Sequence, residues 1–250
     1  MNFPPRLLLV FLFVALLAGL GCGGAHSADE RYYLVSANIK VPYWQEAGAG
    51  FSKAATTLGV KAEFVGPDGY DPQGEVQEFE RVAKLKPAGI LVSPADPKLM
   101  QPAIDNAIAA GIPVITVDSD APQSKRLLFV GTDNYQAGLM GGELAAKRLN
   151  GRGNLVVFTM PEQSNLQERL HGYQDVFSRH PGIKIRQVVD IKGDPRIAFD
   201  TTRELLLKQA KDVDGFICLE ALAGREVANV MSREKATDKL LVAMDTDEDT

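Results

Sequence analysis

The stretch Ile112-Pro113-Val114-Ile115-Thr116-Val117-Asp118 decides the fold: it is a short, β-branched apolar run that ends in a carboxylate. Such a run, bounded by turn-forming residues, is typical of a buried β-strand. A second stretch of the same kind, Leu241-Val242-Ala243-Met244-Asp245, lies far along the chain. The two stretches predict equivalent strands in two similar halves, each strand ending in an aspartate.

Further strand-like runs surround these two stretches, and segments of helical periodicity separate most of them. Strands are expected at 31–37, 60–65, 88–93, 112–117, 126–131, 153–159, 183–190, 214–219 and 239–244. Three helix starts are marked by an aspartate N-cap followed by proline, at Asp71-Pro72, Asp96-Pro97 and Asp194-Pro195. Strands separated by helices form parallel sheets with helices on both faces, so the predicted fold class is α/β.

The two halves repeat the same landmarks in the same order and at nearly the same spacing. Gly89 precedes Asp118 much as Gly215 precedes Asp245. We therefore expect a first lobe over 31–132, a second over 133–246, and the start of a second crossing at 247–250. Because parallel α/β sheets bind ligands beyond the carboxyl ends of their strands, two facing lobes predict a ligand cleft between them.

The N-terminal segment is predicted to be an export signal. Arg6 precedes an apolar run over 7–20, too short for a membrane-spanning helix, and small residues follow it around Cys22. Residues 1–22 are similar to a lipoprotein signal whose cysteine, Cys22, becomes lipidated, with 23–30 as a tether; cleavage after Ala25 is the alternative. The only other cysteine, Cys218, is expected to be a small core residue.

Composition and motifs narrow the set of possible function classes. The 250 residues carry 27 Lys+Arg against 32 Asp+Glu, a net charge of −5 with no basic run, which argues against a nucleic-acid partner. The three histidines have no metal-ligand spacing, and no nucleophile elbow, P-loop or dinucleotide fingerprint occurs. The sequence predicts a binding protein without cofactor or metal, not an enzyme.

The candidate ligand contacts come from both halves. Asp118 and Asp245 are expected to accept hydrogen bonds from ligand hydroxyls, although a turn or capping role and a calcium loop are alternatives. Tyr43 and Trp44 follow Pro42 in the first strand-to-helix loop, where an aromatic face can stack on a sugar ring. Arg169, in the matching region of the second half, offers a fork of donors for ligand oxygens.

With these residues, the chain resembles the type I substrate-binding proteins of bacterial ABC transporters, especially the ribose-binding-like sugar group, from about residue 31 to 250. The resemblance is carried by Pro42-Tyr43-Trp44, the 112–118 strand, Asp133-Asn134-Tyr135-Gln136-Ala137-Gly138, Glu168-Arg169-Leu170-His171-Gly172-Tyr173 and Val242-Ala243-Met244-Asp245. It implies that the aromatic pair stacks on the sugar while the aspartates and the arginine bind its hydroxyls.

Several positions depart from the family pattern. Val41 stands where the ribose binders have asparagine, Ser119 where they have arginine, and Glu220 where a strand-ending asparagine is expected. Ser119, Asp194 and Glu220 are additional candidate ligand contacts, and the altered polar set argues against ribose itself. Family members also continue past the second crossing, so the C-terminal part of the first lobe is expected to be missing from this chain.

The resemblance implies an exported protein of the periplasm or cell envelope, lipid-anchored at Cys22. It implies a monomer that takes a small carbohydrate ligand to an inner-membrane ABC permease by lobe closure. The alternative is a ligand-sensing module for a membrane receptor or sensor kinase, autoinducer binding included.

Overall fold

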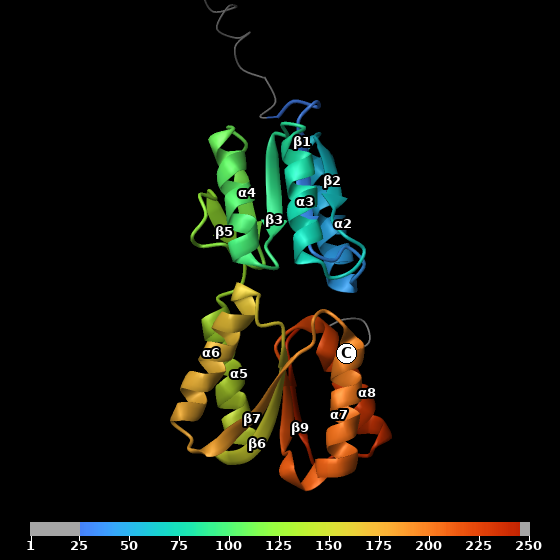
Figure 1. The fold of residues 1–250 in the computed structure, drawn as a ribbon, viewed down its shortest axis with the longest axis vertical. Helices are drawn as coiled ribbons and strands as arrows, with labels where there is room; N and C mark the ends of the chain where they lie inside the picture. Colours follow the sequence, from blue (N-terminus) through green and yellow to red (C-terminus); the bar gives the residue numbers. More distant parts are fainter. Residues whose placement is uncertain (1–25, 246–250) are drawn as a thin grey trace, which may run out of the picture.

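The computed structural model describes residues 26–245, which form two parallel β-sheets with helices on both faces (Figure 1). The first sheet has the strand order β2-β1-β3-β4-β5 and the second the order β7-β6-β8-β9. We call the part built on the first sheet lobe 1 and the part built on the second lobe 2. The predicted α/β class is confirmed.

Lobe 1 alternates strands and helices until its last two strands, which follow one another. Its elements are β1 (Arg31–Ser36), α2 (Pro42–Leu58), β2 (Lys61–Val65), α3 (Pro72–Ala83), β3 (Gly89–Ser93), α4 (Pro97–Ala109), β4 (Val114–Val117) and β5 (Leu128–Val130). Lobe 2 continues the pattern. Its elements are α5 (Asn134–Arg148), β6 (Arg152–Thr159), α6 (Ser164–Ser178), β7 (Gly182–Asp190), α7 (Pro195–Gln209), the short 3-10 helix η1 (Ala210–Asp212), β8 (Gly215–Cys218), α8 (Ala221–Arg233) and β9 (Leu240–Ala243).

Local sequence signals account for these elements. All nine predicted strands are present, each within two residues of the expected limits. Asp71, Asp96 and Asp194 cap α3, α4 and α7 through their carboxylates, with proline in the first turn, as predicted. In contrast, Tyr43 and Trp44 do not lie in a loop: α2 already begins at Pro42, because the fixed φ of proline favours the first helical position.

The two sheets have equivalent topology. In each, the first strand in sequence lies between the second and the third, and every strand pair is parallel. On this basis β1 matches β6, β2 matches β7, β3 matches β8 and β4 matches β9. The repeat seen in the sequence is therefore a repeat of structure, and the carboxyl ends of both sheets face the junction between the lobes (Figure 1).

Each lobe has its own hydrophobic core. Tyr33 and Phe79 are fully buried in lobe 1, and Phe158 stacks on Phe216 in lobe 2 with ring centroids 6.3 Å apart. Cys218 is 1% exposed in the lobe 2 core, which confirms its prediction as a core residue. The expected export signal, Cys22 and the 247–250 crossing lie outside the described residues. Within 26–245, no helix combines the length and apolarity needed to cross a bilayer.

Helices α5 and α6 of lobe 2 approach so closely that their backbones touch. A Cβ atom on Gly138 would lie 2.0 Å from the Arg169 carbonyl oxygen, and one on Gly172 would lie 2.3 Å from the Tyr135 carbonyl oxygen. Real Cβ atoms do not approach backbone oxygens this closely, so only glycine permits the crossing. The contact fixes where α6 presents its inward-facing side chains.

We predict that Gly172→Ala lowers the free energy of unfolding by about 1–3 kcal/mol, because the added methyl group must push the two helices apart. Gly50→Ala in α2 is the matched control, since its Cβ meets nothing within 4 Å. Alanine there should be neutral or stabilising by about 0.5–1 kcal/mol through helix propensity. Urea unfolding followed by circular dichroism measures both variants; equal effects would contradict the close packing.

Candidate functional site

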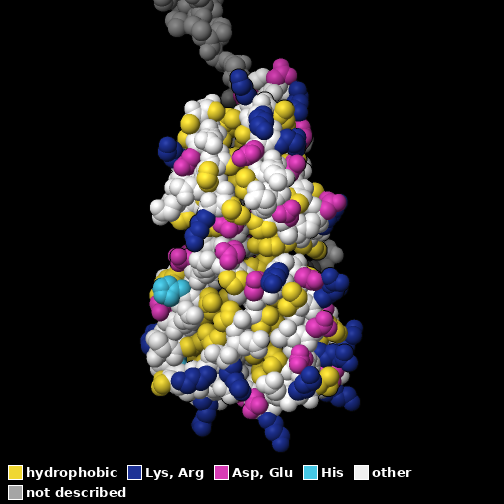
Figure 2. Space-filling model, viewed as in Figure 1, with side chains coloured by type: hydrophobic (Ala, Val, Ile, Leu, Met, Phe, Trp, Pro, Cys, Tyr) yellow, Lys and Arg dark blue, Asp and Glu magenta, His cyan; other side chains and the backbone are white. Residues whose placement is uncertain are grey.

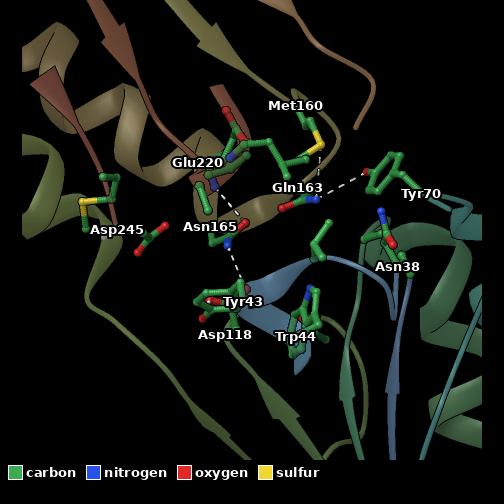
Figure 3. Close-up of a pocket in the computed structure, with 18 of the residues that line it drawn as sticks. Asn38, Tyr43, Trp44, Tyr70, Asp118, Met160, Gln163, Asn165, Glu220 and Asp245 are labelled. Atoms are coloured by element: carbon green, nitrogen blue, oxygen red, sulfur yellow. Dashed lines mark hydrogen bonds between the residues drawn. The ribbon is translucent and has the colours of Figure 1, made fainter. Parts of the chain in front are cut away.

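A cavity lies between the lobes, at the carboxyl ends of both sheets (Figure 3). Lobe 1 contributes Asn38, Tyr43, Trp44, Glu46, Tyr70 and Asp118. Lobe 2 contributes Gln163, Asn165, Arg169, Glu220, Arg225 and Asp245. The cavity holds about 160 Å³; at ~30 Å³ per water in the liquid this is the space of roughly five waters, enough for a small molecule such as a monosaccharide.

Two aspartates at equivalent places of the two lobes border this cavity. Asp118 directly follows β4 and Asp245 comes two residues after β9. Both have left-handed backbone conformation, with φ of 61° for Asp118 and 67° for Asp245. This conformation costs a non-glycine residue about 1–2 kcal/mol and is concentrated at functional sites. The two equivalent positions thus share one backbone conformation, and both residues line the cavity.

The carboxylate of Asp118 connects both sides of the cleft. Its Oδ1 accepts a hydrogen bond from the Tyr43 hydroxyl at 2.8 Å, within lobe 1. Its Oδ2 accepts one from Asn165 Nδ2 at 3.4 Å, from α6 of lobe 2 (Figure 3). Asp118 is therefore one of the points where groups from the two lobes meet, and Ser93 is a further hydrogen-bond partner of its carboxylate.

The aromatic pair lies in the first turn of α2 and faces the cavity. The rings of Tyr43 and Trp44 meet edge to face, with centroids 5.2 Å apart and planes at 89°. The hydrogen bond to Asp118 fixes the Tyr43 ring, and the edge-to-face contact in turn orients Trp44. The structure thus brings both predicted aromatic residues to the cavity, with their rings perpendicular to each other.

Arg169 projects from α6 and is buried, with 5% of the residue exposed. Its Nε and Nη2 both donate to Oδ1 of Asn134, Nε at 3.1 Å, and its Nη1 donates to the Leu219 carbonyl at the end of β8. A guanidinium has five N–H groups, so two remain for a ligand after these three bonds. The predicted arginine is therefore held rigidly with part of its donor set unused.

Glu220 lies at the N-terminus of α8 and also lines the cavity. Its carboxylate accepts backbone hydrogen bonds from Leu222 at 2.6 Å and Ala223 at 3.0 Å, so it is the N-cap of the helix. Burial raises the pKa of Glu220 to about 7, and the two backbone hydrogen bonds work in the opposite direction. This carboxyl group thus changes its charge near neutral pH.

Burial also perturbs the other charged groups of the cavity. It raises the pKa of Asp118 above its ordinary value, opposed by the Tyr43 hydrogen bond and the Arg169 charge. The pKa of Asp245 is raised in the same way and is likewise opposed by Arg169. Burial lowers the pKa of Arg169, and the two aspartates counter it. The three groups therefore compensate one another's loss of hydration.

The structure does not bring two of the predicted contacts to the cavity. Ser119 is 1% exposed, and its hydroxyl lies 3.3 Å from that of Ser164, at the contact between the lobes. Asp194 caps α7 and is paired with Arg196 through both carboxylate oxygens. Both side chains are committed to other partners, and a ligand-binding role for them stays a prediction.

Metal binding finds no support around Asp118. The Asp120 carboxylate is paired with the Arg126 guanidinium and accepts a hydrogen bond from Thr116 Oγ1 at 2.6 Å, so it does not join Asp118 as a ligand. Over residues 26–245, histidine, cysteine and acidic side chains form no group of three placed to hold a metal ion.

Sequence reasoning missed several residues that the structure brings to the site. Asn165 lies one helical turn before Arg169, so i, i+4 spacing on α6 was an available signal. Tyr70 and Gln163 meet across the cleft, with 3.5 Å between the Tyr70 hydroxyl and Gln163 Nε2 (Figure 3). Nothing in the sequence marks this second pair, because its members lie in loops of different lobes.

Known proteins resemble this chain in sequence and in fold. The ribose import binding protein RbsB of Bacillus subtilis (strain 168) is 24% identical over 190 residues, which cover 74% of this chain and 59% of that protein. This chain therefore spans about three-fifths of the length of that relative. A crystal structure of an ABC transporter solute binding protein from Burkholderia graminis C4D1M in complex with D-arabinose has a TM-score of 0.84 at 27% identity, covering 90% of this chain and 79% of that one.

A second solved structure agrees. GanP, a glucose-galactose binding protein from Geobacillus stearothermophilus, has a TM-score of 0.82 at 27% identity and covers 88% of this chain and 79% of its own. The model of the periplasmic binding protein domain family matches residues 32–250, nearly all of the chain after the N-terminal segment. With two parallel-sheet lobes and a cavity between their carboxyl edges, the chain belongs to the periplasmic binding protein domain family and has its type I fold.

Proposed function

We propose that this protein binds a small neutral sugar between its lobes and delivers it to an ABC importer. The observation that carries the proposal is the convergence of Asp118, Asp245 and Arg169 with the Tyr43–Trp44 pair on one cavity of monosaccharide size. Carboxylates accept hydrogen bonds from hydroxyl groups, a guanidinium donates to their oxygens, and an aromatic face packs on the C–H face of a sugar ring.

The charge of the cavity favours a neutral ligand over an anionic one. Four acidic side chains line it, Glu46, Asp118, Glu220 and Asp245, against the two cations Arg169 and Arg225. A sugar carboxylate or phosphate entering this space would meet an excess of like charge, which costs binding free energy. The relatives support the same class, since D-arabinose, glucose and galactose, the sugars with which these two proteins are described, are neutral aldoses.

Lobe closure is the proposed means of signalling the bound state. Besides the Asp118–Asn165 hydrogen bond, two more hydrogen bonds join the lobes. Ser164 Oγ accepts one from the Asp120 N–H at 3.2 Å and donates one to the Asp120 carbonyl at 2.7 Å. Hydrophobic side chains also gather where the lobes meet (Figure 2). A ligand that contacts both lobes only when they are closed shifts the population toward that form by its difference in affinity.

The partner and location are inferred from the relatives. RbsB of B. subtilis is named as a ribose import binding protein, which supports an ABC permease as the partner of the closed form. A location in the periplasm or cell envelope, with a lipid anchor at Cys22, agrees with this role. The protein would act as a monomer and without catalysis.

The first prediction uses Trp44, the only tryptophan, as the reporter. A panel of D-ribose, D-arabinose, D-xylose, D-glucose and D-galactose should contain a sugar that changes its fluorescence saturably. Asp118→Asn and Asp245→Asn should each weaken the binding of that sugar about 10- to 100-fold, because a hydrogen bond to a charged group contributes ~1.5–3 kcal/mol.

The control for this titration is Asp212→Asn, an exposed carboxylate in η1 at the opposite edge of lobe 2. The dissociation constant of this variant for the same sugar should stay within about twofold of the native value. A folded native protein that responds to no sugar of the panel would refute the proposed ligand class.

The second prediction concerns ligand charge. D-Glucuronate and D-galacturonate should bind at least about 10-fold more weakly than D-glucose and D-galactose, because the acidic lining repels the added carboxylate. Competition against the bound panel sugar, read from Trp44 fluorescence, measures the ratio. Equal or tighter binding of the uronates would show that the arginines, not the carboxylates, control the site.

The third prediction follows from the raised pKa of Glu220. The folded state holds this proton more tightly than the unfolded chain, so Glu220 favours folding at low pH and the benefit is lost as pH rises from about 4.5 to about 7. Glu220→Gln, which keeps a capping oxygen, should therefore gain stability relative to the native protein between pH 5 and pH 8, by up to ~3 kcal/mol.

Chemical unfolding followed by circular dichroism at the two pH values measures this difference. Glu234→Gln, an exposed residue at the other end of α8, is the matched control and should show no such gain. A pH-independent difference between the native protein and Glu220→Gln would contradict the assigned titration.

A further inference from the structure

The Asn134 side chain occupies an unusual place, between the ligand-facing arginine and the segment that crosses from one lobe to the other. Asn134 is the first residue of α5, directly after the crossing over 131–133, and it is 6% exposed. Its Oδ1 accepts two hydrogen bonds from Arg169, and its Nδ2 donates to the Thr132 carbonyl at 3.0 Å. Both the oxygen and the nitrogen of the Asn134 amide are thus hydrogen-bonded.

The orientation of the amide is dictated by chemistry. A guanidinium only donates hydrogen bonds, so the Asn134 atom that faces Arg169 must be the oxygen. The NH₂ group is then directed at Thr132, whose carbonyl only accepts. Asparagine satisfies both demands at once, whereas aspartate lacks the donor and alanine lacks both groups.

The packing of the helices makes the contact possible. Gly138 and Gly172 let the α5 and α6 backbones touch, which brings the start of α5 against the middle of α6. Arg169 is thereby held at both ends of its guanidinium, by Asn134 from α5 and by the Leu219 carbonyl from the end of β8. Its two remaining N–H groups are left for the cavity, which Arg169 lines.

We propose that Asn134 is a positioning residue: it fixes the guanidinium of Arg169 for the ligand and connects it to the backbone of the crossing at Thr132. This inference rests on the proposed function, because it takes the ligand to be a sugar that Arg169 binds. A chain of hydrogen bonds then runs from ligand to Arg169, to Asn134, to the crossing. Ligand binding and the geometry of the crossing are coupled through one amide.

Sugar affinity in a double-mutant cycle tests the positioning role. With the panel sugar that the native protein binds most tightly, Asn134→Ala should raise the dissociation constant about 10-fold or more. In the Arg169→Met background the same change should have less than about a twofold effect, because the group it positions is gone. Equal losses of affinity in both backgrounds would overturn the proposal, and so would an unchanged affinity of Asn134→Ala in the protein that keeps Arg169.

A control separates positioning from damage to the helix start. Asp133→Ala removes the N-cap of the same helix, whose side chain accepts a hydrogen bond from the Gln136 N–H at 3.0 Å; the hydrogen bonds of Arg169 within residues 26–245 go to Asn134 and Leu219. It should lower the thermal midpoint while leaving sugar affinity within about twofold. A loss of affinity as large as that of Asn134→Ala would assign the effect to α5 itself.

A second readout needs no sugar. The Nε–H signal of Arg169 in a ¹⁵N NMR spectrum, assigned by its absence from Arg169→Met, should be protected from solvent exchange in the native protein. It should lose protection in Asn134→Ala and keep it in Asn134→Asp, whose carboxylate still accepts. Unchanged protection in Asn134→Ala refutes the positioning even if no sugar binds, whereas failure of the proposed function alone leaves this signal as expected.

Discussion

A guanidinium that is removed from water must have its N–H groups paired and its charge balanced, and the architecture of the cleft meets both needs for Arg169. Asn134 and the Leu219 carbonyl take three of its N–H groups. Asp118 and Asp245 supply the balancing charge. These partners come from the start of α5, the end of β8 and the turns after β4 and β9. The relative placement of four elements is therefore tied to a single side chain.

The duplicated architecture explains how two lobes produce one site. Equivalent strands β4 and β9 end in the same left-handed aspartate, so each lobe directs one carboxylate at the junction. The remaining contacts are not duplicated: the aromatic pair belongs to lobe 1 and the arginine to lobe 2. A shared scaffold thus provides the symmetric acid pair, while different side chains on α2 and α6 make the cavity asymmetric.

The sequence was sufficient for the fold because local signals determine it. Short stretches that each contain apolar residues and at least one Val or Ile mark the strands, and an aspartate followed by proline marks three helix starts. Of the predicted contacts, Tyr43, Trp44, Asp118, Arg169, Glu220 and Asp245 reach the cavity. Ser119 does not, since its side chain points into the lobe contact at Ser164. The support of Arg169 by Asn134 depends on how α5 packs on α6, a long-range fact that no local pattern encodes.

The left-handed backbone at Asp118 and Asp245 limits how this site can diverge. Glycine, asparagine and aspartate tolerate that conformation, while β-branched or bulky residues are strongly disfavoured. Drift at the two positions is thus confined to a small set of short residues before any ligand is considered. A change of ligand would therefore come from the surrounding side chains on α2, α6 and α8, while the two short residues that follow β4 and β9 stay nearly constant.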